Sequence, residues 1–408
     1  MLRQAVILVG GSSARPDTRP GDRTATTPKP VNVGGRPFLD VLIDEVARYD
    51  VFEEILLLAG SMDEPIRARH AGTTRGRARV SVALEQEPLG TAGALARAAR
   101  LMQDKFLLLQ SDSFFDFNLL DLVSRAGSSL VHMALRAEMA GDRSARAVLD
   151  NDRVRAFIAP CHSATDPVNA GVYVIDRSVV DCIDRLPASF EQDILPALAA
   201  SGALKGTCYP GYFLDIGNAE DRANAEIALQ ERLRRPAVFF DRDGVLNYDT
   251  GYIFEPSKLK WIDGAREAIK AVNDAGYFAF VVSNQSGVAR GLYQECDIHS
   301  LHRWMADEMA SVGAHIDAFE YCPDHPEGTV EQYRRVSDRR KPAPGMITDL
   351  LRRFPVNADD SILIGDKASD IEAARAAGLR GYLFSGDNLD AFVKQHLRPR
   401  IDHAKKPG

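Results

Sequence analysis

Two aspartates separated by one residue follow an apolar run in the second half of the chain. The run Ala237-Val238-Phe239-Phe240 is typical of a buried strand, and Asp241-Arg242-Asp243-Gly244 comes directly after it. Carboxylates two residues apart at the end of a strand face the same cleft, where they can share a magnesium ion. One of them can attack a phosphorus centre while the other moves a proton. The pattern alone also fits an ordinary acidic turn, because Asp and Gly favour turns.

Three later segments could complete such a site. Val281-Val282-Ser283-Asn284 predicts a strand that ends in a hydroxyl and an amide, which can donate to a phosphoryl oxygen. Arg340-Lys341 supplies two cations suited to phosphate. Ile362–Asp366 predicts a third strand, followed by a helical stretch over Ile371–Ala377 that stops at Gly378. Strands that alternate with helices form parallel sheets, which bind ligands at the carboxyl ends of the strands, so the four segments should converge on one cleft.

Residues 236–390 resemble the haloacid dehalogenase (HAD) superfamily of phosphatases, and within it the D-glycero-D-manno-heptose 1,7-bisphosphate 7-phosphatases. The motifs that carry this resemblance are Phe240–Asn247, Asp249–Tyr252, Asn284–Gly291, Arg340–Met346 and Gly365–Lys367.

The resemblance implies a catalytic role for each residue of the expected cleft. Asp241 would be the nucleophile that forms an aspartyl-phosphate, and Asp243 would protonate the leaving sugar oxygen and then deprotonate water. Ser283 and Lys341 would steady the phosphoryl group. Mg²⁺ would be held by Asp241, Asp366 and the backbone at Asp243. The substrate-binding residues that the resemblance implies are Asp249, Thr250, Gly251, Tyr252, Asn284, Gln285, Ser286, Arg340 and Lys367.

The two carboxylates should lie in different environments. A metal keeps Asp241 ionised, whereas Asp243 must be able to hold a proton. Asp370 has two interpretations: a ligand in the metal shell, or an acid in the first turn of a helix, where the helix dipole favours it.

The chain departs from the phosphatase pattern in one loop. Many members of this family hold a structural zinc with a Cys-x-His pair and a Cys-x-Cys pair before the Arg-Lys-Pro motif. Here the two positions read Cys322-Pro323-Asp324 and Ser337-Asp338-Arg339, with His325 nearby. Structural zinc requires four ligands, so we expect no zinc and a loop over residues 322–339 that is held by other contacts.

The first half of the chain opens with a strand and glycines. Gln4–Val9 predicts a buried strand that leads into Gly10-Gly11, where backbone N–H groups can approach phosphates closely. Residues 1–230 resemble the sugar-1-phosphate nucleotidyltransferases, especially those that make GDP-mannose-like or GDP-heptose-like products. The later segments of this resemblance are Glu87–Ala94, Phe106–Ser113, Asn169–Val174, Ser189–Asp193 and Phe213–Gly217.

This second resemblance implies a transferase site that uses GTP and Mg²⁺. Gly10, Gly11 and Arg15 would hold the triphosphate. Lys29 would neutralise charge in the transition state. The remaining assignments are Asp112 and Asp215 for Mg²⁺, Gly90 for the nucleoside, and Asn169, Gly171 and Glu191 for the sugar.

Two departures leave the activity of this half open. Ser13, Ala14 and Pro16 replace the third glycine, the threonine and the leucine of the usual phosphate loop. The stretch Phe157–Pro160 lacks the Glu-Lys that usually grips the sugar phosphate, and Arg155 could replace it. The half is therefore either an active transferase or a degenerate module that binds sugar or positions the phosphatase.

The chain should form two α/β domains, each a Rossmann-like three-layer sandwich. We place a nucleotidyltransferase-like domain with a mixed sheet at 1–232, a HAD-like domain with a parallel sheet at 236–390, and a tail at 391–408. A helical pattern over Ala219–Leu233 leads into the boundary at Glu231–Pro236.

Composition excludes several other classes of protein. A net charge of −7 argues against a general nucleic-acid binder. Apolar runs fall short of the roughly 20 residues that span a bilayer. Because Met1–Ile7 leads straight into a predicted core strand, we expect no cleavable signal. Five cysteines without framework spacing suit the cytoplasm; Cys161, Cys182, Cys208 and Cys296 should be inert packing residues. His299 and His302 should lie on an exposed helix face rather than bind metal.

Together the two halves predict a bifunctional enzyme of nucleotide-activated heptose synthesis. The phosphatase would remove the 7-phosphate of a heptose 1,7-bisphosphate, and the transferase would add GMP from GTP to the heptose 1-phosphate. Small phosphorylated sugars and GTP are the expected partners, without nucleic acid or membrane. The alternatives are a phosphatase with a degenerate first half, or a phosphatase of the histidinol-phosphate type. The base, the anomer and the oligomeric state stay open.

Overall fold

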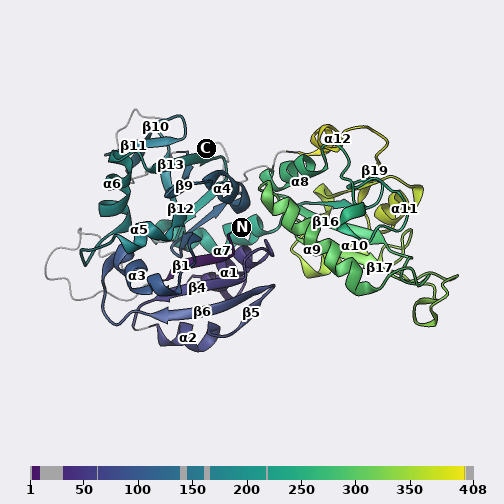
Figure 1. Cartoon of the computed structure of the whole chain (residues 1–408), viewed down its shortest axis with the longest axis horizontal. Helices are drawn as coiled ribbons and strands as arrows, with labels where there is room; N and C mark the ends of the chain where they lie inside the picture. Colours follow the sequence, from purple (N-terminus) through teal and green to yellow (C-terminus); the bar gives the residue numbers. More distant parts are fainter. Residues whose placement is uncertain are drawn as a thin grey trace. The chain divides into compact units, whose positions relative to one another are not determined.

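The computed structural model describes residues 2–9, 31–61, 63–137, 145–159, 166–216, 219–398 and 400. The chain divides into two compact units, Met1–Gln230 and Glu231–Gly408 (Figure 1). Both units combine helices with β-sheet, so the chain is a two-domain mixed α/β protein.

A mixed sheet of ten strands forms the centre of the N-terminal unit, in the order β10-β11-β13-β9-β12-β7-β1-β4-β6-β5. Its strands are β1 (Gln4–Val9), β4 (Glu54–Ala59), β5 (Thr74–Arg75), β6 (Ala78–Leu84), β7 (Lys105–Gln110), β9 (Val131–Arg136), β10 (Arg146–Asp150), β11 (Arg153–Ile158), β12 (Val168–Asp176) and β13 (Leu204–Tyr209). Two small ladders accompany it: β2 (Asn32–Val33) with β3 (Arg36–Pro37), and β8 (Ser113–Asp116) with β14 (Tyr212–Asp215). The helices are α1 (Phe38–Ala47), α2 (Glu64–His70), α3 (Gly90–Ala98), α4 (Leu119–Ala126), α5 (Arg177–Asp181), α6 (Leu195–Ala200) and α7 (Ala219–Leu233).

Strand β1 is buried along its whole length and runs parallel to both of its neighbours, β4 and β7. Parallel neighbours share their carboxyl edge. The N–H of Ser111, just after β7, accordingly donates to the carbonyl of Leu8 in β1 over 3.1 Å. Strand β12 runs antiparallel to β7, which makes the sheet mixed, as the resemblance predicts.

The C-terminal unit is built on five parallel strands in the order β17-β16-β15-β18-β19. They are β15 (Ala237–Phe240), β16 (Phe278–Asn284), β17 (Ala318–Cys322), β18 (Ile362–Gly365) and β19 (Arg380–Leu383). The helices are α8 (Ala265–Asp274), α9 (Glu295–Ser311), α10 (Gly345–Arg353), α11 (Ala368–Ala376) and α12 (Leu389–His396).

Alternate side chains of these strands enter two separate cores. In β15, Val238 and Phe240 pack with helices α8, α9 and α12, whereas Ala237 and Phe239 pack with α10 and α11. Because successive side chains of a strand point to opposite faces, helices cover both faces of the sheet. A parallel sheet buried on both faces reads as continuous apolar runs, which explains why the sequence of β15 lacks alternation.

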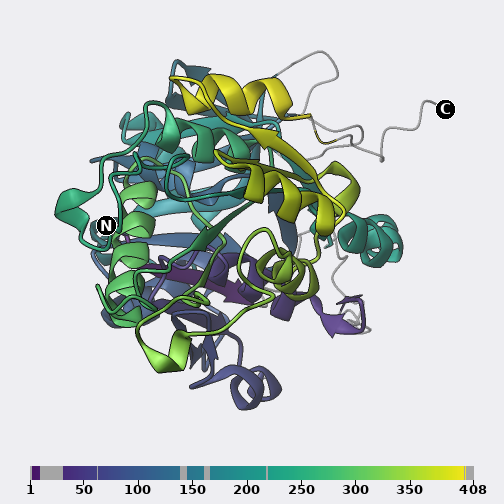
Figure 2. The same cartoon turned by 90° about the vertical axis from the view of Figure 1, so that its right-hand side faces the viewer.

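The end of the described chain belongs to the C-terminal unit. Helix α12, drawn in yellow in Figure 1 and Figure 2, buries Leu389 and Val393 in the core shared with α8. Beyond it, Tyr277 donates to the carbonyl of Arg398 over 2.9 Å. The segment expected to be a tail from residue 391 therefore begins with a packed helix.

Several expectations about single side chains were wrong. His302 is 5% exposed and its ring stacks on Phe319, so it does not lie on an exposed helix face. Cys182, Cys208 and Cys296 are exposed and are not packing residues, and Cys161 lies outside the described residues. Helices long and apolar enough to cross a bilayer are absent from the described part of the chain.

Candidate functional site

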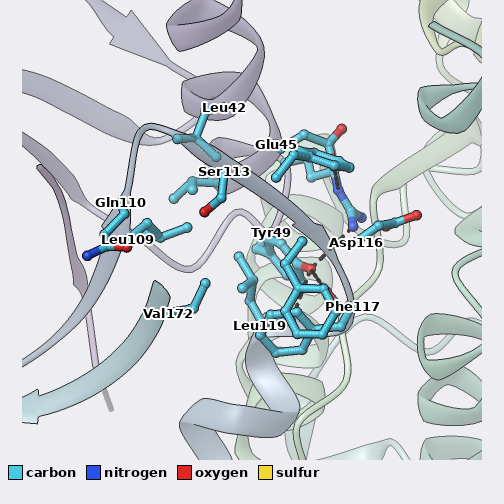
Figure 3. A pocket seen from close by; sticks show the side chains of 14 residues that line it. Leu42, Glu45, Tyr49, Leu109, Gln110, Ser113, Asp116, Phe117, Leu119 and Val172 are labelled. Atoms are coloured by element: carbon cyan, nitrogen blue, oxygen red, sulfur yellow. Dashed lines mark hydrogen bonds and ion pairs between the residues drawn. The ribbon is translucent and has the colours of Figure 1, made fainter. Parts of the chain in front are cut away.

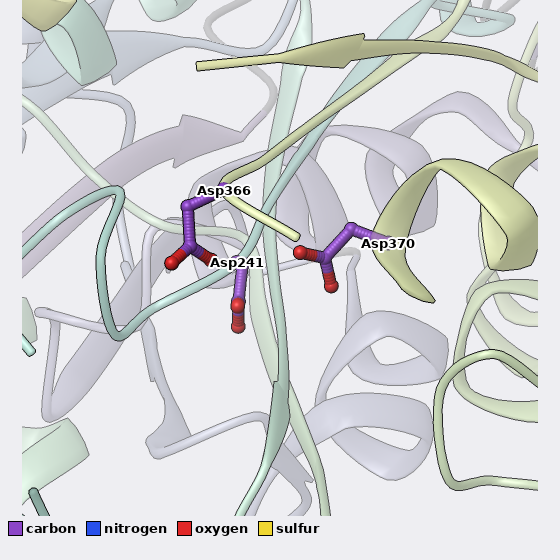
Figure 4. Close-up of side chains that lie close together, drawn as sticks. All are labelled: Asp241, Asp366 and Asp370. Carbon is purple, nitrogen blue, oxygen red and sulfur yellow. The ribbon is translucent and has the colours of Figure 1, made fainter. Parts of the chain in front are cut away.

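Three neighbouring strands of the C-terminal sheet end at the predicted cleft. Asp241 follows β15, Asp366 follows β18, and Ser283 lies near the end of β16. The carboxylates of Asp241, Asp366 and Asp370 each place an oxygen within 4.8 Å of the others (Figure 4). The order of the parallel strands thus brings together acids that are far apart in the sequence.

Lys341 connects two of these carboxylates. Its Nζ lies 2.8 Å from Asp241 Oδ1 and 2.7 Å from Asp370 Oδ1, and it donates to the carbonyl of Val282 over 2.8 Å. The side chain is 4% exposed. Burial lowers the pKa of Lys341, but Asp241 and Asp370 outweigh burial and raise the pKa above its usual value. A charged ammonium is therefore fixed beside the expected nucleophile.

Asp370 lies in the first turn of α11, which is one of the two interpretations that the sequence left open, and it lies beside the carboxylates that could hold a metal. Its Oδ2 accepts the N–H of Lys367 over 3.0 Å, so it caps the start of α11, and its other oxygen contacts Lys341. A Cβ at Gly365 would lie 2.2 Å from the Asp370 side chain. The approach of β18 to this helix therefore requires glycine.

Asp243 lies in a separate hydrogen-bond network. Its oxygens accept from Asn247 Nδ2 over 2.9 Å, from Gln285 Nε2 over 2.8 Å, and from the fully buried guanidinium of Arg242 over 2.9 Å. Gln285 also donates to Ser283 Oγ over 2.7 Å and accepts from the Tyr293 hydroxyl over 2.8 Å. The network fixes the Asp243 carboxylate and ties it to the strand that carries Ser283.

The environments of the two cleft aspartates differ, and the donors around Asp243 oppose the protonated form that its expected role requires. Burial raises the pKa of Asp241 to about 7, against the opposing effect of Lys341. Burial also acts on Asp243, but Arg242, Asn247 and Gln285 outweigh it and lower the pKa of Asp243. The reason is that donors that stabilise a carboxylate gather around Asp243.

The donor set around Asp241 fits a hard divalent cation. Asp366 Oδ1 is buried and has no hydrogen-bond partner in the described part of the chain. Gly244 adopts φ +91°, and a Cβ there would lie 2.3 Å from Asp366 Oδ2, so the loop cradles this carboxylate closely. Mg²⁺ prefers oxygen ligands and is commonly held by one or two carboxylates. Asp241 and Asp366 suit this preference, with Asp370 adjacent.

A cleft of about 560 Å³ opens over these groups. Its size suits a small ligand. Of the predicted phosphatase site residues, Thr250 and Asp366 are not among the described residues that line it. Those that line it are Asp241, Asp243, Asp249, Gly251, Tyr252, Ser283, Asn284, Gln285, Ser286, Arg340, Lys341 and Lys367.

Several residues that line the cleft or contact Asp243 were not predicted from the sequence as site residues. Tyr293 and Ser369 also line the cleft, and Arg242 and Asn247 hold Asp243. Arg242 and Asn247 lie inside the motif Phe240–Asn247, and this position was a usable signal. Tyr293 follows the glycine-rich stretch after β16 and carried no signal of its own.

The loop over residues 322–339 does not fit zinc. Asp324 is 2% exposed and its Oδ1 lies 3.0 Å from Arg335 Nε, so it is paired with a cation. Burial raises the pKa of the Cys322 thiol, which disfavours the thiolate that zinc needs. Arg339 places a cation at one of the expected ligand positions, where it cannot bind zinc. The loop is held by ion pairs, and Tyr333 adds a hydrogen bond to Glu295 over 2.6 Å.

The predicted transferase residues are placed in part. The N–H of Ile216 donates to the carbonyl of Asp112 over 2.8 Å, and Asp215 pairs with Ser113 across the β8–β14 ladder. The two predicted metal ligands are therefore neighbours along this ladder. Gly10, Gly11, Arg15 and Lys29 lie outside the described residues.

Glu191 belongs to a second cluster, near the irregular start of β12. It accepts from Thr91 Oγ1 over 2.8 Å and from Ser189 Oγ over 3.1 Å. Burial, with Glu191 and Asp112 nearby, raises the pKa of Tyr173 well above its usual value. The Tyr173 hydroxyl accepts from Asn169 Nδ2 over 2.6 Å, so it contacts the predicted sugar-binding residues.

Two of the predicted glycines make close backbone approaches. Gly171 adopts φ +73°, and a Cβ there would lie 2.7 Å from Gln110 Oε1. Its N–H donates to Asn169 Oδ1 over 3.0 Å. Gly90 adopts φ +79°, and a Cβ there would lie 2.4 Å from the carbonyl of Ala188. Gly171 and Gly90 therefore adopt conformations that need glycine, and Asn169 fixes the backbone at Gly171.

A small cavity of about 30 Å³ near Tyr49 is not a ligand site (Figure 3). Tyr49 donates to the carbonyl of Phe117 and accepts from the N–H of Leu119, each over 3.1 Å. A space of this volume holds little more than a water molecule. It is a packing defect beside the hydroxyl.

The C-terminal site combines a buried carboxylate, an ammonium held between two carboxylates and a further, hydrogen-bonded carboxylate, an arrangement suited to phosphoryl transfer. Comparisons with known proteins agree. A model described as nucleotidyl transferase matches residues 4–232, more than half of the chain, and a HAD-hydrolase-like model matches residues 338–401.

The D-glycero-beta-D-manno-heptose-1,7-bisphosphate 7-phosphatase of Rhodopseudomonas palustris is 52% identical over 164 residues, which are 40% of this chain and 91% of that protein. The D-glycero-alpha-D-manno-heptose-1,7-bisphosphate 7-phosphatase of Burkholderia mallei is 44% identical over 147 residues, covering 36% and 78%. The crystal structure of HddC from Yersinia pseudotuberculosis complexed with GMP-PN is 24% identical, covers 56% of this chain and 100% of that chain, and gives a TM-score of 0.48. The chain belongs to the nucleotidyl transferase family in its N-terminal half and to the heptose-bisphosphate 7-phosphatase family in its C-terminal unit.

Proposed function

We propose that the chain carries out two consecutive steps in the synthesis of a nucleotide-activated heptose. The C-terminal unit would hydrolyse the 7-phosphate of D-glycero-D-manno-heptose 1,7-bisphosphate. The N-terminal unit would transfer GMP from GTP to the resulting heptose 1-phosphate. The observation that carries the proposal is the contact of Lys341 with both Asp241 and Asp370 beside the network of Asp243.

In the phosphatase step, Asp241 attacks the phosphorus and the bond to the sugar oxygen breaks. Asp243 gives its proton to that oxygen, which leaves as the sugar hydroxyl. In the second step Asp243 takes a proton from water, which attacks the aspartyl-phosphate and releases phosphate. The hydrogen bonds that lower the pKa of Asp243 favour its role as a base in the second step, so the proton that it gives in the first step would be one it takes from solvent or from the substrate's phosphate.

The other residues of the cleft place the phosphoryl group. Ser283 and Lys341 lie on either side of the nucleophile and can donate to phosphoryl oxygens. Mg²⁺ held by Asp241, Asp366 and the backbone at Asp243 would neutralise the charge of these oxygens and keep Asp241 ionised. Arg340, Lys367 and the remaining lining residues would contact the sugar.

In the transferase step, an oxygen of the sugar phosphate attacks the α-phosphorus of GTP and pyrophosphate leaves. Asp112 and Asp215 would hold Mg²⁺, and Asn169, Gly171 and Glu191 would orient the sugar. Gly10, Gly11, Arg15 and Lys29 would contact the triphosphate, with Gly90 near the nucleoside.

The finer expectations about organisation belong to the same proposal. We infer domains at 1–232 and from 236 to the end of helix α12, each a Rossmann-like three-layer sandwich, in a cytoplasmic enzyme. The packed helices on both faces of the C-terminal sheet and the parallel strands around β1 support this inference.

A product assay tests the proposal. Either anomer of heptose 1,7-bisphosphate is incubated with the protein, Mg²⁺ and each of the four NTPs in turn, and phosphate, pyrophosphate and nucleotide-sugar are measured. Phosphate release followed by pyrophosphate with GTP is expected. Phosphate without pyrophosphate for any nucleotide would show that the N-terminal unit is a binding module, and no phosphate would refute the phosphatase.

A further inference from the structure

The catalytic lysine is preceded by a cation with an unusual set of contacts. Arg339 reaches Glu320 on strand β17 through one nitrogen and Asp349 on helix α10 through another. Glu320 is largely buried, with 13% of its side chain exposed, while Arg339 and Asp349 are about a third exposed. Arg339 therefore connects a strand, a helix and the loop that leads to Lys341.

The same segment is fixed on both sides of Arg339. On the amino-terminal side, the carbonyl of Asp338 accepts the N–H of Gly345 over 2.8 Å, and a Cβ at Gly345 would lie 2.5 Å from that carbonyl. On the carboxyl-terminal side, the backbone N–H of Lys341 donates to Asn284 Oδ1, and Asn284 Nδ2 donates back to the Lys341 carbonyl, each over 3.0 Å. These contacts fix the backbone, and the Arg339 pairs set its distance from the sheet.

Attraction between opposite charges explains why Arg339 pairs with Glu320 and Asp349. Glu320 and Asp349 carry two negative charges beside a loop in which Arg339 and Arg335 are cations. Each carboxylate contacts a different nitrogen of the planar Arg339 guanidinium, whose rigid shape fixes the direction of both pairs. Glu320 also pairs with Arg353, so its carboxylate is balanced from the helix as well.

We propose that Arg339 is a positioning residue for Lys341, and that its ion pairs with Glu320 and Asp349 hold the loop that a metal would otherwise cross-link. The expected loss of kcat rests on the proposed phosphatase function, whereas the expected change in hydrogen exchange of the loop does not. Lys341 must place one ammonium against two carboxylates, and a displacement of about 1 Å at such a group can lower the rate a hundredfold.

Arg339→Met is the test variant, and Arg353→Met is the matched control because it removes a pair to the same Glu320 from the helix surface. Two quantities are compared: kcat and KM for heptose 1,7-bisphosphate with Mg²⁺, and amide hydrogen exchange of residues 334–345. For Arg339→Met we expect kcat to fall about ten- to a hundredfold, KM to change little, and exchange of the segment to rise. Arg353→Met should leave both quantities near wild type, and Arg339→Lys should recover part of the loss.

Three results would overturn the proposal: unchanged exchange and kcat in Arg339→Met, an equal loss in Arg353→Met, or stoichiometric zinc in the purified protein. If Arg339→Met does not fold, Asp349→Asn removes one of the two contacts and is compared with Arg352→Met, which removes another pair to Asp349. If the wild type releases no phosphate, the proposed function fails while the exchange comparison still decides the role of Arg339.

Discussion

The two units place carboxylates at the ends of strands in different ways. In the C-terminal unit, Asp241 and Asp366 follow adjacent parallel strands, and their carboxylates lie close to each other and to Asp370. In the N-terminal unit, Asp112 lies directly before the two-stranded β8–β14 ladder, and Asp215 ends its second strand. The predicted phosphate loop of that unit, with Gly10, Gly11 and Arg15, lies outside the described residues. The phosphatase site is thus set by the order of the sheet, whereas the transferase site also depends on a loop.

The two predicted sites also differ in how hydrogen bonds hold their side chains before substrate binds. Asp243, Gln285 and Ser283 bond to one another, so moving any one of them moves the others. Glu191 is similarly held by Thr91 and Ser189, and also by Gln110 at the end of β7, two residues before Asp112. Side chains held in such a network carry less reorganisation cost at the moment of reaction.

Substitution of the proposed nucleophile should abolish the phosphatase activity and leave the transferase activity unchanged. Asp241→Asn removes the attacking oxygen charge, so phosphate release should fall by roughly 10⁴-fold or more. Pyrophosphate formation from GTP and added heptose 1-phosphate should be unchanged, because Asp241 belongs to the other unit. Retained phosphate release in a folded variant would refute the assignment of the nucleophile.

A substitution in the N-terminal unit tests the predicted transferase site in the same way. Asp112→Ala removes a predicted metal ligand, and pyrophosphate formation should fall by about a thousandfold. Phosphate release from heptose 1,7-bisphosphate serves as the internal control and should not change. A variant that forms pyrophosphate at the wild-type rate would remove Asp112 from the site.

A methyl group can test how closely the phosphatase loop is built. Gly244→Ala would place a Cβ 2.3 Å from Asp366 Oδ2 at φ +91°. The carboxylate must move, so phosphate release should fall about a hundredfold and the Mg²⁺ concentration for half-maximal rate should rise.

The matched control for this variant is Gly378→Ala. Gly378 has a similar φ of +77°, but its Cβ would meet no atom within 4 Å. It therefore carries the backbone strain without the clash, and the rate should stay within about twofold of wild type. Equal losses in both variants would mean that strain, and not contact with Asp366, limits the reaction.

Sequence patterns predicted the strands better than the polar networks. The observed bounds of β1, β15 and α7 match the predicted runs, because apolar length and helix signals determine these elements locally. The convergence of Asp241 and Asp366 also followed from strand order. The full burial of Arg242 and the contact of Lys341 with two carboxylates could not be predicted in this way. Both depend on which side chains the tertiary fold packs around the cation, and residue type alone does not distinguish a buried cation from a solvated one.

The two units should also differ in how their stability depends on pH. His132 in the N-terminal unit is 2% exposed, and burial lowers its pKa from 6.5 to about 4. The unfolded chain then binds a proton between these values that the folded chain does not. Stability is therefore fully present above about pH 6.5 and falls as the pH drops towards 4, by at most about 3 kcal/mol from this residue.

His132→Gln can keep a hydrogen bond to Thr207, which His132 makes over 2.8 Å, while it removes the titration. Both tryptophans, Trp261 and Trp304, lie in the C-terminal unit, so fluorescence follows the unfolding of that unit and circular dichroism follows both. The variant should reduce the pH dependence seen by circular dichroism between pH 6.5 and 4 and leave the fluorescence transition unchanged. An equal change in both signals would mean that the two units unfold as one, because a substitution confined to one unit can reach the other's tryptophans only through cooperative unfolding.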